Sequence, residues 1–505
     1  MATLKEITDL IESPSKADLE LISKAFSFSE EAHSNNKRLS GEPYFIHASE
    51  TAKILAEYGM GASTISSGLL HDVIEDTPVT SEELGKEFGE EILFLVEGVT
   101  KLGKLKYHGT DRHNESMRKL FVAMSQDIRI LMIKLADRLH NIRTLSYVPK
   151  EKQTRIAGET LEIFAPIAYR LGIRKLSREL EDLSFPFVYP KEYDDLKKIV
   201  KRQHEDSVEN LEKFLKSIKK ALAKNSAPYI RTEYRVKGIY SLYKKLKAKK
   251  KNIEEVHDML ALRVIVPTIA DCYTALGVMH GVWRPLPGKI KDYIAFPKPN
   301  GYQALHTTIF TGDGSVVEIQ IKTEEMYQHS EYGIASHISY KGVGKKNKRL
   351  ESLDWIKQLM PNTKSKDSST KDQARDVPHW IKDLASHHMA ISQEGMLNEE
   401  IKKDFFNHRI FVFSPIGDVV DLPIESTPVD FAYAIHSDIG NHIAGAKVNN
   451  KMVSLDTILK NGDIVEVINR VGSKPNIKWL EYVKTSIAKR SIRSAIQKLK
   501  KEDTK

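Results

Sequence analysis

The hydrophobic pattern of this chain changes near its middle, and the change limits the folds open to it. Before Asn225-Ser226-Ala227-Pro228, apolar residues recur at intervals of three and four, as in helices with one buried face. After these residues, short apolar runs such as 259–266 and 316–321 alternate with helical patterns. A chain of 505 residues is also too long for one core and suggests about three domains. The sequence therefore predicts a helical part followed by a mixed α/β domain.

Composition narrows the class of protein further. The single cysteine, Cys272, excludes an intramolecular disulfide and a cysteine-rich zinc site. No apolar run is long enough to cross a bilayer, and residues 1–10 carry charges where a signal peptide has its apolar stretch. We therefore expect a cytoplasmic protein. Its formal charge of +9, from 77 Lys plus Arg against 68 Asp plus Glu, is compatible with polyphosphate ligands or RNA.

The first pattern that indicates chemistry is His71-Asp72, followed one helical turn later by Glu75-Asp76. Residues 65–76 carry apolar side chains at helical spacing, so we expect one helix with these four polar groups along one wall. A His-Asp doublet alone is common and often belongs to helices that merely pack. The four groups together indicate a hydrolytic site.

Two further helical patterns carry matching side chains. One opens at Pro43 and holds His47; the other places Lys134, Asp137 and Asn141 on one face. Two imidazoles and two carboxylates suit a divalent transition metal such as manganese better than magnesium, which prefers oxygen ligands. Such a metal acidifies a bound water, and the acidic pair that follows the His-Asp doublet would orient that water or take its proton.

The second domain begins with a candidate polyphosphate cradle. Lys237, Ser241 and Lys245 recur at intervals of four beside Arg235, which places them on one helical face. The later lysine run at 247–251 reads instead as a solvated helix face.

A magnesium site is predicted where two acids from neighbouring elements meet. Asp258 stands just before the strand that holds Arg263, and alternation in 316–322 turns Glu318, with Gln320, away from the buried face. The basic loop 288–302 between them has an aromatic end that can stack a base. A P-loop is excluded, because Gly342-Val343-Gly344-Lys345 lacks the required spacing and hydroxyl.

The C-terminal part reads as a third, small domain. Residues 409–423 predict a hairpin, Thr427 with Pro428 predicts a helix start, and 460–463 predicts a turn before a strand at 464–467. A lysine-, serine- and aspartate-rich stretch from 342 to 375 precedes it and reads as a linker. The pattern is that of a compact, ubiquitin-like module.

Three segments of the helical part resemble the hydrolase domain of long RelA/SpoT homologues, which make and destroy the alarmone (p)ppGpp. They are residues 38–47 (RLSGEPYFIH), 71–77 (HDVIEDT) and 134–141 (KLADRLHN). The resemblance implies removal of pyrophosphate from the 3′ position. It also implies manganese ligands at His47, His71, Asp72 and Asp137, water-handling acids at Glu75 and Asp76, and nucleotide contacts at Arg38, Asn141 and Thr144.

The second domain is similar to the synthetase domain of the same family, which moves pyrophosphate from ATP to the 3′-hydroxyl of GDP or GTP. Residues 289–292 (KIKD) are similar to the basic loop of bifunctional members, with lysine where arginine is usual at the first place and again at Lys322. The resemblance implies that Arg235 and Arg263 hold the adenine and that phosphates are held by Lys237, Ser241, Lys245, Lys291 and Lys298. It implies that Asp258 binds magnesium and that Tyr302 stacks on the acceptor guanine. It also implies that Glu318 helps activate the 3′-hydroxyl, with Gln320 and His306 nearby.

The third domain resembles the family's TGS domain, in which a histidine equivalent to His436 contacts the 3′ end of uncharged tRNA on the ribosome. Considered alone, His436 is more often a capping or surface histidine. The basic tail is compatible with contact to rRNA phosphates and with a solvated amphipathic helix. We do not expect the zinc-finger-like and ACT or RRM-like domains into which longer members continue.

The fold class expected from these patterns and the resemblance is multidomain. We expect an all-α HD-type hydrolase domain (1–153), a helical bridge (154–224), an α/β nucleotidyltransferase-like synthetase domain (225–341), a linker with helical segments (342–404), a β-grasp TGS domain (405–470) and a basic helical tail (471–505).

Three functions are compatible with this organisation. The first is a bifunctional synthetase and hydrolase with manganese in one site and magnesium in the other. The second is a hydrolase whose synthetase domain senses nucleotides, and the third is a tRNA- or ribosome-binding regulator with vestigial enzyme domains. The complete ligand set and the basic loop with its two acids favour the first. Because two opposed activities would waste ATP, we expect them to be alternately favoured, with the helical bridge as the coupling element.

Overall fold

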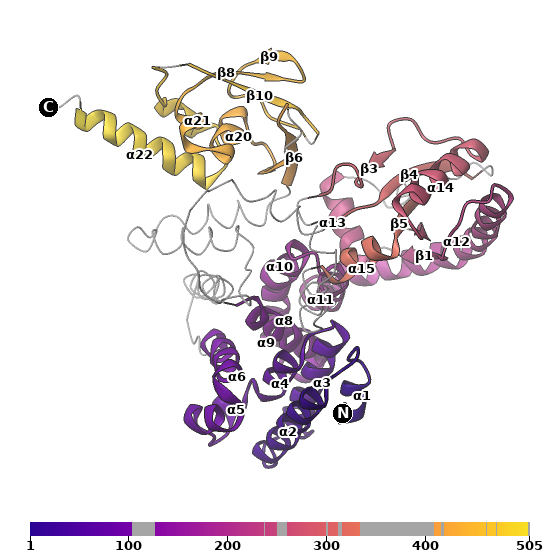
Figure 1. The fold of residues 1–505 in the computed structure, drawn as a ribbon, viewed down its shortest axis with the longest axis vertical. Coiled ribbons are helices and arrows are strands. Elements are labelled where there is room, and N and C mark those ends of the chain that lie inside the picture. Colours follow the sequence, from indigo (N-terminus) through magenta and orange to yellow (C-terminus); the bar gives the residue numbers. More distant parts are fainter. Residues whose placement is uncertain are drawn as a thin grey trace. The chain divides into compact units, whose positions relative to one another are not determined.

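The computed structural model divides the chain into two compact units, Met1–His388 and Met389–Lys505 (Figure 1). It describes residues 1–103, 127–236, 238–249, 260–298, 301–311, 316–333, 409–415, 419–460, 462–470 and 472–502. Lys237, Asp258 and the expected linker at 342–404 lie outside these ranges. Within the described ranges, no helix combines the length and apolar character needed to cross a bilayer.

The first unit begins with a bundle of helices, as the 3.6-residue periodicity predicts. Its elements are α1 (Leu4–Thr8), α2 (Lys16–Ala32), α3 (Phe45–Glu57), α4 (Ala62–Leu70), α5 (Val73–Asp76), α6 (Ser81–Gly103) and α8 (Ile128–Arg143). Ser15 begins α2 with a reciprocal capping box to Asp18. Helix α8 packs against α3, α4 and α6, and its residues Ile130, Leu131 and Leu135 are fully buried. This burial fixes the rotation of α8 and therefore the direction of its polar face.

The His-Asp doublet lies in a break between two helices, so the expectation of one continuous helix over 65–76 is wrong. Helix α4 ends at Leu70 and α5 begins at Val73. His71 Nδ1 donates a hydrogen bond to the Gly68 carbonyl at 2.8 Å. This bond competes with the backbone hydrogen bond to the same carbonyl that would continue the helix. The Asp72 carbonyl then accepts the amides of Glu75 and Asp76 and starts α5.

A run of helices follows and includes residues 154–224, the range expected for the helical bridge. It consists of η1 (Leu145–Tyr147), α9 (Lys150–Glu159), the π-helical turn η2 (Thr160–Phe164), α10 (Ala165–Arg170), α11 (Arg174–Val188) and α12 (Pro190–Lys224). Helix α11 packs against α8 of the N-terminal bundle and against α9. It also packs against two helices of the following domain, so one helix contacts the neighbourhoods of both predicted sites.

The next domain is a five-stranded mixed sheet. Its elements are β1 (Arg231–Val236), α13 (Ile239–Lys249), β2 (Leu260–Val266), α14 (Ile269–Val282), β3 (Lys291–Asp292), β4 (Leu305–Phe310), β5 (Val316–Thr323) and α15 (Glu324–Tyr332). The strand order is β1-β2-β5-β4-β3, with β2 and β5 parallel and the other pairs antiparallel. Val317, Ile319 and Ile321 of β5 lie in the core together with α12 and α14, as alternation predicts.

The opposite, polar face of this sheet is also covered. Gln320 is 6% exposed and Lys322 only 1%. Helix α15 packs onto β5, and its Ser330 hydroxyl lies 3.2 Å from the Lys322 Nζ. The polar residues therefore form a buried cluster rather than an open surface.

The second unit is a small module of two sheets and helices. Its elements are β6 (Arg409–Phe413), β7 (Val419–Pro423), α20 (Pro428–Ile435), α21 (Ser437–Asn441), β8 (Ile443–Val448), β9 (Lys451–Val453), β10 (Val465–Asn469), η5 (Ile477–Glu481) and α22 (Ser486–Glu502). The predicted hairpin is the β6–β7 pair, and Thr427 begins α20 as expected. Ala488 and Ile492 of α22 are buried in one core with α20, so the basic tail is not a freely solvated helix.

Candidate active sites

Three elements of the helical bundle bring the predicted metal ligands together. His47 comes from α3, His71 from the break after α4, and Asp137 from α8, and all three side chains are buried. One ligand atom of each lies within 4.8 Å of the others. Asp72 joins them, with its Oδ2 at 3.1 Å from His71 Nε2 and 3.6 Å from His47 Nε2. The four predicted ligands therefore converge on one point.

The histidine tautomers suit a bound cation. His71 Nδ1 donates to the Gly68 carbonyl, so its Nε2 is the nitrogen left to face a cation. Against the effect of burial, the Asp72 carboxylate raises the pKa of His71 to about 9, so this Nε2 holds a proton that a bound metal ion would replace. That Nε2 is buried and has no hydrogen-bond partner, although a carboxylate lies beside it. A buried, unmatched ring nitrogen among carboxylates fits a divalent metal ion, because metal-ligating histidines hold their other N–H on an acceptor.

Neighbouring charges keep the two carboxylates ionised. Burial alone would raise the pKa of Asp137, but the Lys134 ammonium at 2.7 Å and His47 hold that pKa well below its usual range. Burial likewise opposes ionisation of Asp72, and its contact with His71 outweighs this and lowers the pKa. The Tyr44 hydroxyl also donates to Asp72 Oδ2 at 2.7 Å. Both acids are therefore available as anionic ligands.

The three predicted nucleotide-contact residues meet at the edge of this cluster. Arg38 donates to Asn141 Oδ1 at 2.6 Å, to Thr144 Oγ1 at 3.4 Å and to His140 Nδ1 at 3.1 Å. Burial, with the nearby His47 and Arg38, lowers the pKa of His140 to about 3, so this ring is neutral. A guanidinium held beside these predicted metal ligands is placed to bind a phosphorylated ligand.

The acidic pair Glu75 and Asp76 lies on α5, directly after Asp72, and both residues are exposed. The Asp76 carbonyl accepts a bond from the Asn36 side chain at 2.7 Å, which ties α5 to the chain before α3. Their role in handling water stays a prediction.

In the sheet domain, the predicted acid Glu318 is part of a hydrogen-bonded group. Its Oε1 lies 3.0 Å from His306 Nδ1 and accepts from Gln320 Nε2 at 3.2 Å. His306 Nε2 lies 2.7 Å from the Tyr302 hydroxyl. Strand register places His306 beside Gln320 and Gln320 beside Arg263, so the predicted residues share one face of the sheet.

The two predicted adenine-binding arginines lie on the same face. Arg263 is 5% exposed and donates to Glu233 Oε1 at 3.0 Å and Glu331 Oε1 at 3.1 Å. Arg235 has a buried Nε with no hydrogen-bond partner, and burial lowers the pKa of its guanidinium to about 10. A second bond joins Glu331 to Arg178 of α11.

The bridge also covers the predicted base-stacking residue. Tyr302 is 3% exposed, and its ring lies under the Arg174 guanidinium of α11 at 4.3 Å. The Lys322 and Lys298 ammonium groups lie 4.6 Å and 5.3 Å from the ring centre. A base that stacks on Tyr302 must therefore displace at least one of these cations.

The predicted phosphate-binding residues are distributed around α13 and the basic loop. Ser241 donates to Glu181 at 3.3 Å, and Asp182 accepts the Tyr240 amide at 3.0 Å, so two acids of α11 face the start of α13. Lys245 lies half-buried on α13 and Lys291 is exposed on β3. Their contacts with phosphates stay predictions, as do the roles of Lys237 and Asp258, which lie outside the described residues.

Sequence reasoning missed several residues of the two sites. Tyr44, Lys134 and His140 stand inside the motifs but carried no assigned role. Only their positions inside those motifs could have indicated that these three residues belong to the site. Arg174 and Glu331 carried no local pattern, because their contacts join segments far apart in the sequence.

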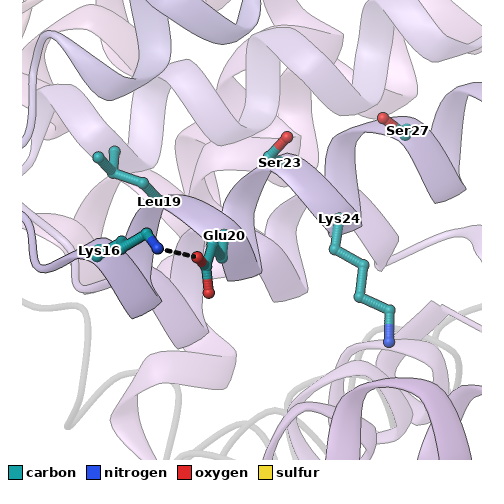
Figure 2. A pocket seen from close by; sticks show the side chains of 6 residues that line it. All are labelled: Lys16, Leu19, Glu20, Ser23, Lys24 and Ser27. Atoms are coloured by element: carbon teal, nitrogen blue, oxygen red, sulfur yellow. Dashed lines mark ion pairs between the residues drawn. The ribbon is translucent and has the colours of Figure 1, made fainter.

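Two other features are His436 and a hollow along α2. His436 is exposed, and its Nδ1 accepts the Asp438 amide at 3.2 Å to begin α21, so it is both a surface and a capping histidine. A shallow hollow lies along α2 and includes the Lys16–Glu20 ion pair (Figure 2). One helix lines this hollow, and none of its residues belongs to either polar cluster.

Three segments of the chain match known families, and the HD match extends beyond the expected domain end at residue 153. Residues 25–174 match the HD domain, residues 234–345 match the region found in RelA and SpoT proteins, and residues 410–469 match the TGS domain.

Three curated relatives match nearly the whole chain. A GTP pyrophosphokinase of Myxococcus xanthus is 44% identical over 490 residues, covering 96% of this chain and 61% of the relative. A guanosine-3′,5′-bis(diphosphate) 3′-pyrophosphohydrolase of Aquifex aeolicus (strain VF5) is 42% identical over 484 residues, 96% of this chain and 65% of the relative. The bifunctional (p)ppGpp synthase/hydrolase SpoT of Escherichia coli (strain K12) is 40% identical over 506 residues, 100% of this chain and 69% of the relative.

The fold and sites thus define a multidomain protein in which an HD-type helical domain precedes a synthetase-type sheet and a TGS module. The chain belongs to the RelA/SpoT family. It spans about three fifths of the length of the first two relatives.

Proposed function

We propose that this chain is a bifunctional alarmone enzyme. It hydrolyses (p)ppGpp to GDP or GTP plus pyrophosphate, and it transfers pyrophosphate from ATP to the 3′-hydroxyl of GDP or GTP. The observation that carries the proposal is the presence, in one chain, of the buried His47, His71 and Asp137 cluster and of the Glu318 group on the sheet. The names of the relatives include both activities.

For hydrolysis, we assign the four converging side chains, His47, His71, Asp72 and Asp137, to a manganese ion. Such an ion, when bound, acidifies a water molecule. Arg38, with Asn141 and Thr144, holds the nucleotide through its phosphates. Glu75 and Asp76 follow the ligand Asp72 on α5 and take the proton of the attacking water.

For synthesis, we assign Glu318 as the group that accepts the proton of the acceptor 3′-hydroxyl. His306 at 3.0 Å and Gln320 at 3.2 Å orient its carboxylate. Arg235 and Arg263 hold the adenine, and the lysines of α13 and the basic loop neutralise the phosphates. Asp258 binds the magnesium ion that accompanies ATP.

We propose that α11 makes the two activities alternate. Its Asp182 caps the start of α13, where ATP phosphates would bind, and its Arg174 covers Tyr302. The approach is close, because a Cβ added at Gly238 would lie 2.6 Å from Asp182 Oδ2. The same helix packs on α8, which carries Asp137. Movement of α11 would therefore open one site while changing the other.

We further propose that the TGS module contacts uncharged tRNA through His436. The exposure of this histidine beside the start of α21 supports the assignment. Loss of tRNA crosslinking in His436→Ala, with no change in hydrolysis, is the expected result.

Nucleotide chromatography of two reactions tests the main proposal. One contains ppGpp with manganese, and the other contains magnesium-ATP with GDP or GTP. We expect both reactions to run, with Asp72→Ala stopping only hydrolysis and Asp258→Ala stopping only synthesis. Hydrolysis without synthesis, even with uncharged tRNA and ribosomes added, would reduce the sheet domain to a nucleotide sensor.

A further inference from the structure

We propose that His140 is a positioning residue that holds the metal ligand His47 and the nucleotide-contact residue Arg38 at once, by accepting a hydrogen bond from each at its Nδ1. The inference rests on the hydrolase site proposed above and adds a residue outside the predicted set. Its support is geometric: the His140 side chain is buried, and two donors converge on one of its atoms.

The tautomer of His47 explains the first bond. Its Nε2 faces the carboxylates of Asp137 at 3.3 Å and Asp72 at 3.6 Å, so this nitrogen is the one that points at the cation. A ring nitrogen that binds a cation carries no proton, and the proton of a neutral imidazole is then on Nδ1. His140 Nδ1 lies 2.8 Å from this Nδ1 and accepts the hydrogen bond that it donates.

The second ligand histidine shows the same arrangement with a different acceptor. His71 donates its Nδ1–H to the Gly68 carbonyl at 2.8 Å. A fixed acceptor behind each ligand histidine sets the ring orientation and raises the basicity of the nitrogen that faces the metal. For His47 a side chain performs this task, so it can be altered by substitution without touching the backbone.

Arg38 fixes the direction of the second bond. A guanidinium has only donors, so the 3.1 Å contact between Arg38 Nη1 and His140 Nδ1 runs from arginine to histidine. His140 must therefore present an unprotonated Nδ1 and carry its own proton on Nε2. One lone pair thereby receives bonds from a metal ligand and from a nucleotide contact.

A closed ring of contacts results. Arg38 also donates to Asn141 Oδ1, and Asn141 Nδ2 donates to Asp137 Oδ1. Asp137 in turn faces His47, which returns to His140. Through this ring the ligand cluster and the nucleotide-contact arginine hold each other in place, and His140 is the member that closes it.

Three substitutions of His140 distinguish a role as hydrogen-bond acceptor from a role in packing alone. In His140→Asn, the amide oxygen can take the place of Nδ1 as acceptor. In His140→Gln, the amide lies one bond farther out, near the place of Nε2, and His140→Phe keeps a ring but removes every acceptor. Thermal unfolding of each variant in a metal chelator shows whether the metal-free chain still folds.

The measurement is calorimetric titration of manganese into the full chain. We expect His140→Asn to stay within about threefold of the unsubstituted chain, and the Gln and Phe variants to bind manganese about 10- to 100-fold more weakly. The KM for ppGpp should rise in the same two variants, because Arg38 loses its acceptor.

Two results would overturn the inference while leaving the hydrolase site intact. One is equal manganese affinity in all four chains, and the other is an equal loss in the Asn and Gln variants, which would make the ring shape and not the acceptor decisive. Absence of manganese binding by the unsubstituted chain would overturn the metal site itself, and the role of His140 with it.

Discussion

At the scale of single residues, several basic side chains gather on the polar face of the five-stranded sheet. Lys322 is almost fully buried, and burial beside Arg263 holds its pKa well below the usual range. Burial, together with Arg174 and Lys291, lowers the pKa of Lys298 to about 7. Such a cluster is poorly compensated until an anion enters, so a polyphosphate would relieve it.

Nucleotide binding should therefore take up protons. At pH 8 the Lys298 amine is mostly neutral in the free chain, and a bound phosphate restores its proton, so we expect uptake of roughly one proton. At pH 6 the uptake should be small. Calorimetry with an ATP analogue in buffers of different ionisation enthalpy measures it. Lys298→Arg, which stays charged, should reduce the uptake, and an unchanged value in that variant would contradict the assignment.

The same shift predicts the sign of a stability effect. Lys298 binds its proton more weakly in the folded chain than in the unfolded chain, where the ordinary value is 10.5. The unfolded state then holds more protons between about pH 7 and 10.5, so this group makes the free energy of unfolding rise with pH across that window.

Arg38 provides a residue-scale prediction for hydrolysis. Its guanidinium donates to His140 through Nη1 and to Asn141 through Nη2. A lysine ammonium does not reproduce this two-pronged geometry. We expect Arg38→Lys to raise the KM for ppGpp about tenfold, with a smaller effect on kcat. Arg155→Lys, on the exposed side of α9, is the matched control and should change neither constant. Equal kinetics in both variants would remove Arg38 from the nucleotide contact.

At the scale of elements, α11 is the part that contacts both halves of the first unit. Removing its cap on α13 should favour nucleotide binding there. We expect Asp182→Ala to bind an ATP analogue roughly three- to tenfold more tightly, because the carboxylate no longer competes with phosphate at the start of the helix. Lys191→Ala on α12 serves as the control. Weaker binding in the Asp182 variant would mean that the contact supports the synthetase site instead of blocking it.

In the second unit, the side chain of Asp430 joins two segments that are far apart in the sequence. Its Oδ1 accepts the amides of Lys484 and Thr485, and its Oδ2 accepts the Thr427 amide, so one buried carboxylate ties the start of α20 to the segment before α22. Asp430→Ala leaves these donors unmatched and should lower the free energy of unfolding of this unit by about 3 kcal/mol. Hydrogen exchange of β8 amides in the full chain measures the loss.

Asp430→Asn is the matched comparison for that variant. It keeps one acceptor oxygen and should fall between the alanine variant and the unsubstituted chain. Unchanged exchange in the alanine variant would show that α22 is held by its apolar contacts alone.

At the scale of the whole molecule, the sequence predicted most of the architecture because helical and strand periodicities are local properties. The spacing of apolar and turn residues predicted the helical part, the hairpin and the start of α20, and the structure brings the predicted metal ligands His47, His71 and Asp137 together. The break at His71 was missed, because a side chain and not a helix-breaking residue ends α4 there.

What could not be predicted depends on contacts between distant segments. The covered face around Lys322 requires α15 to fold back onto β5. The cap by Asp182 joins residues 58 positions apart, and the acceptor role of His140 depends on a neighbour 93 positions away. Periodicity carries no information about such pairs.

The central claim is that one chain contains two opposed sites that are alternately favoured. The most direct measurement follows ppGpp hydrolysis with manganese while the synthetase site is saturated with GDP and a non-hydrolysable ATP analogue. We predict that hydrolysis falls as the analogue saturates, and that Asp258→Ala abolishes this fall. The contradicting result has two parts. Hydrolysis continues at its full rate with the analogue bound, and the same chain synthesises at its full rate when ATP replaces the analogue.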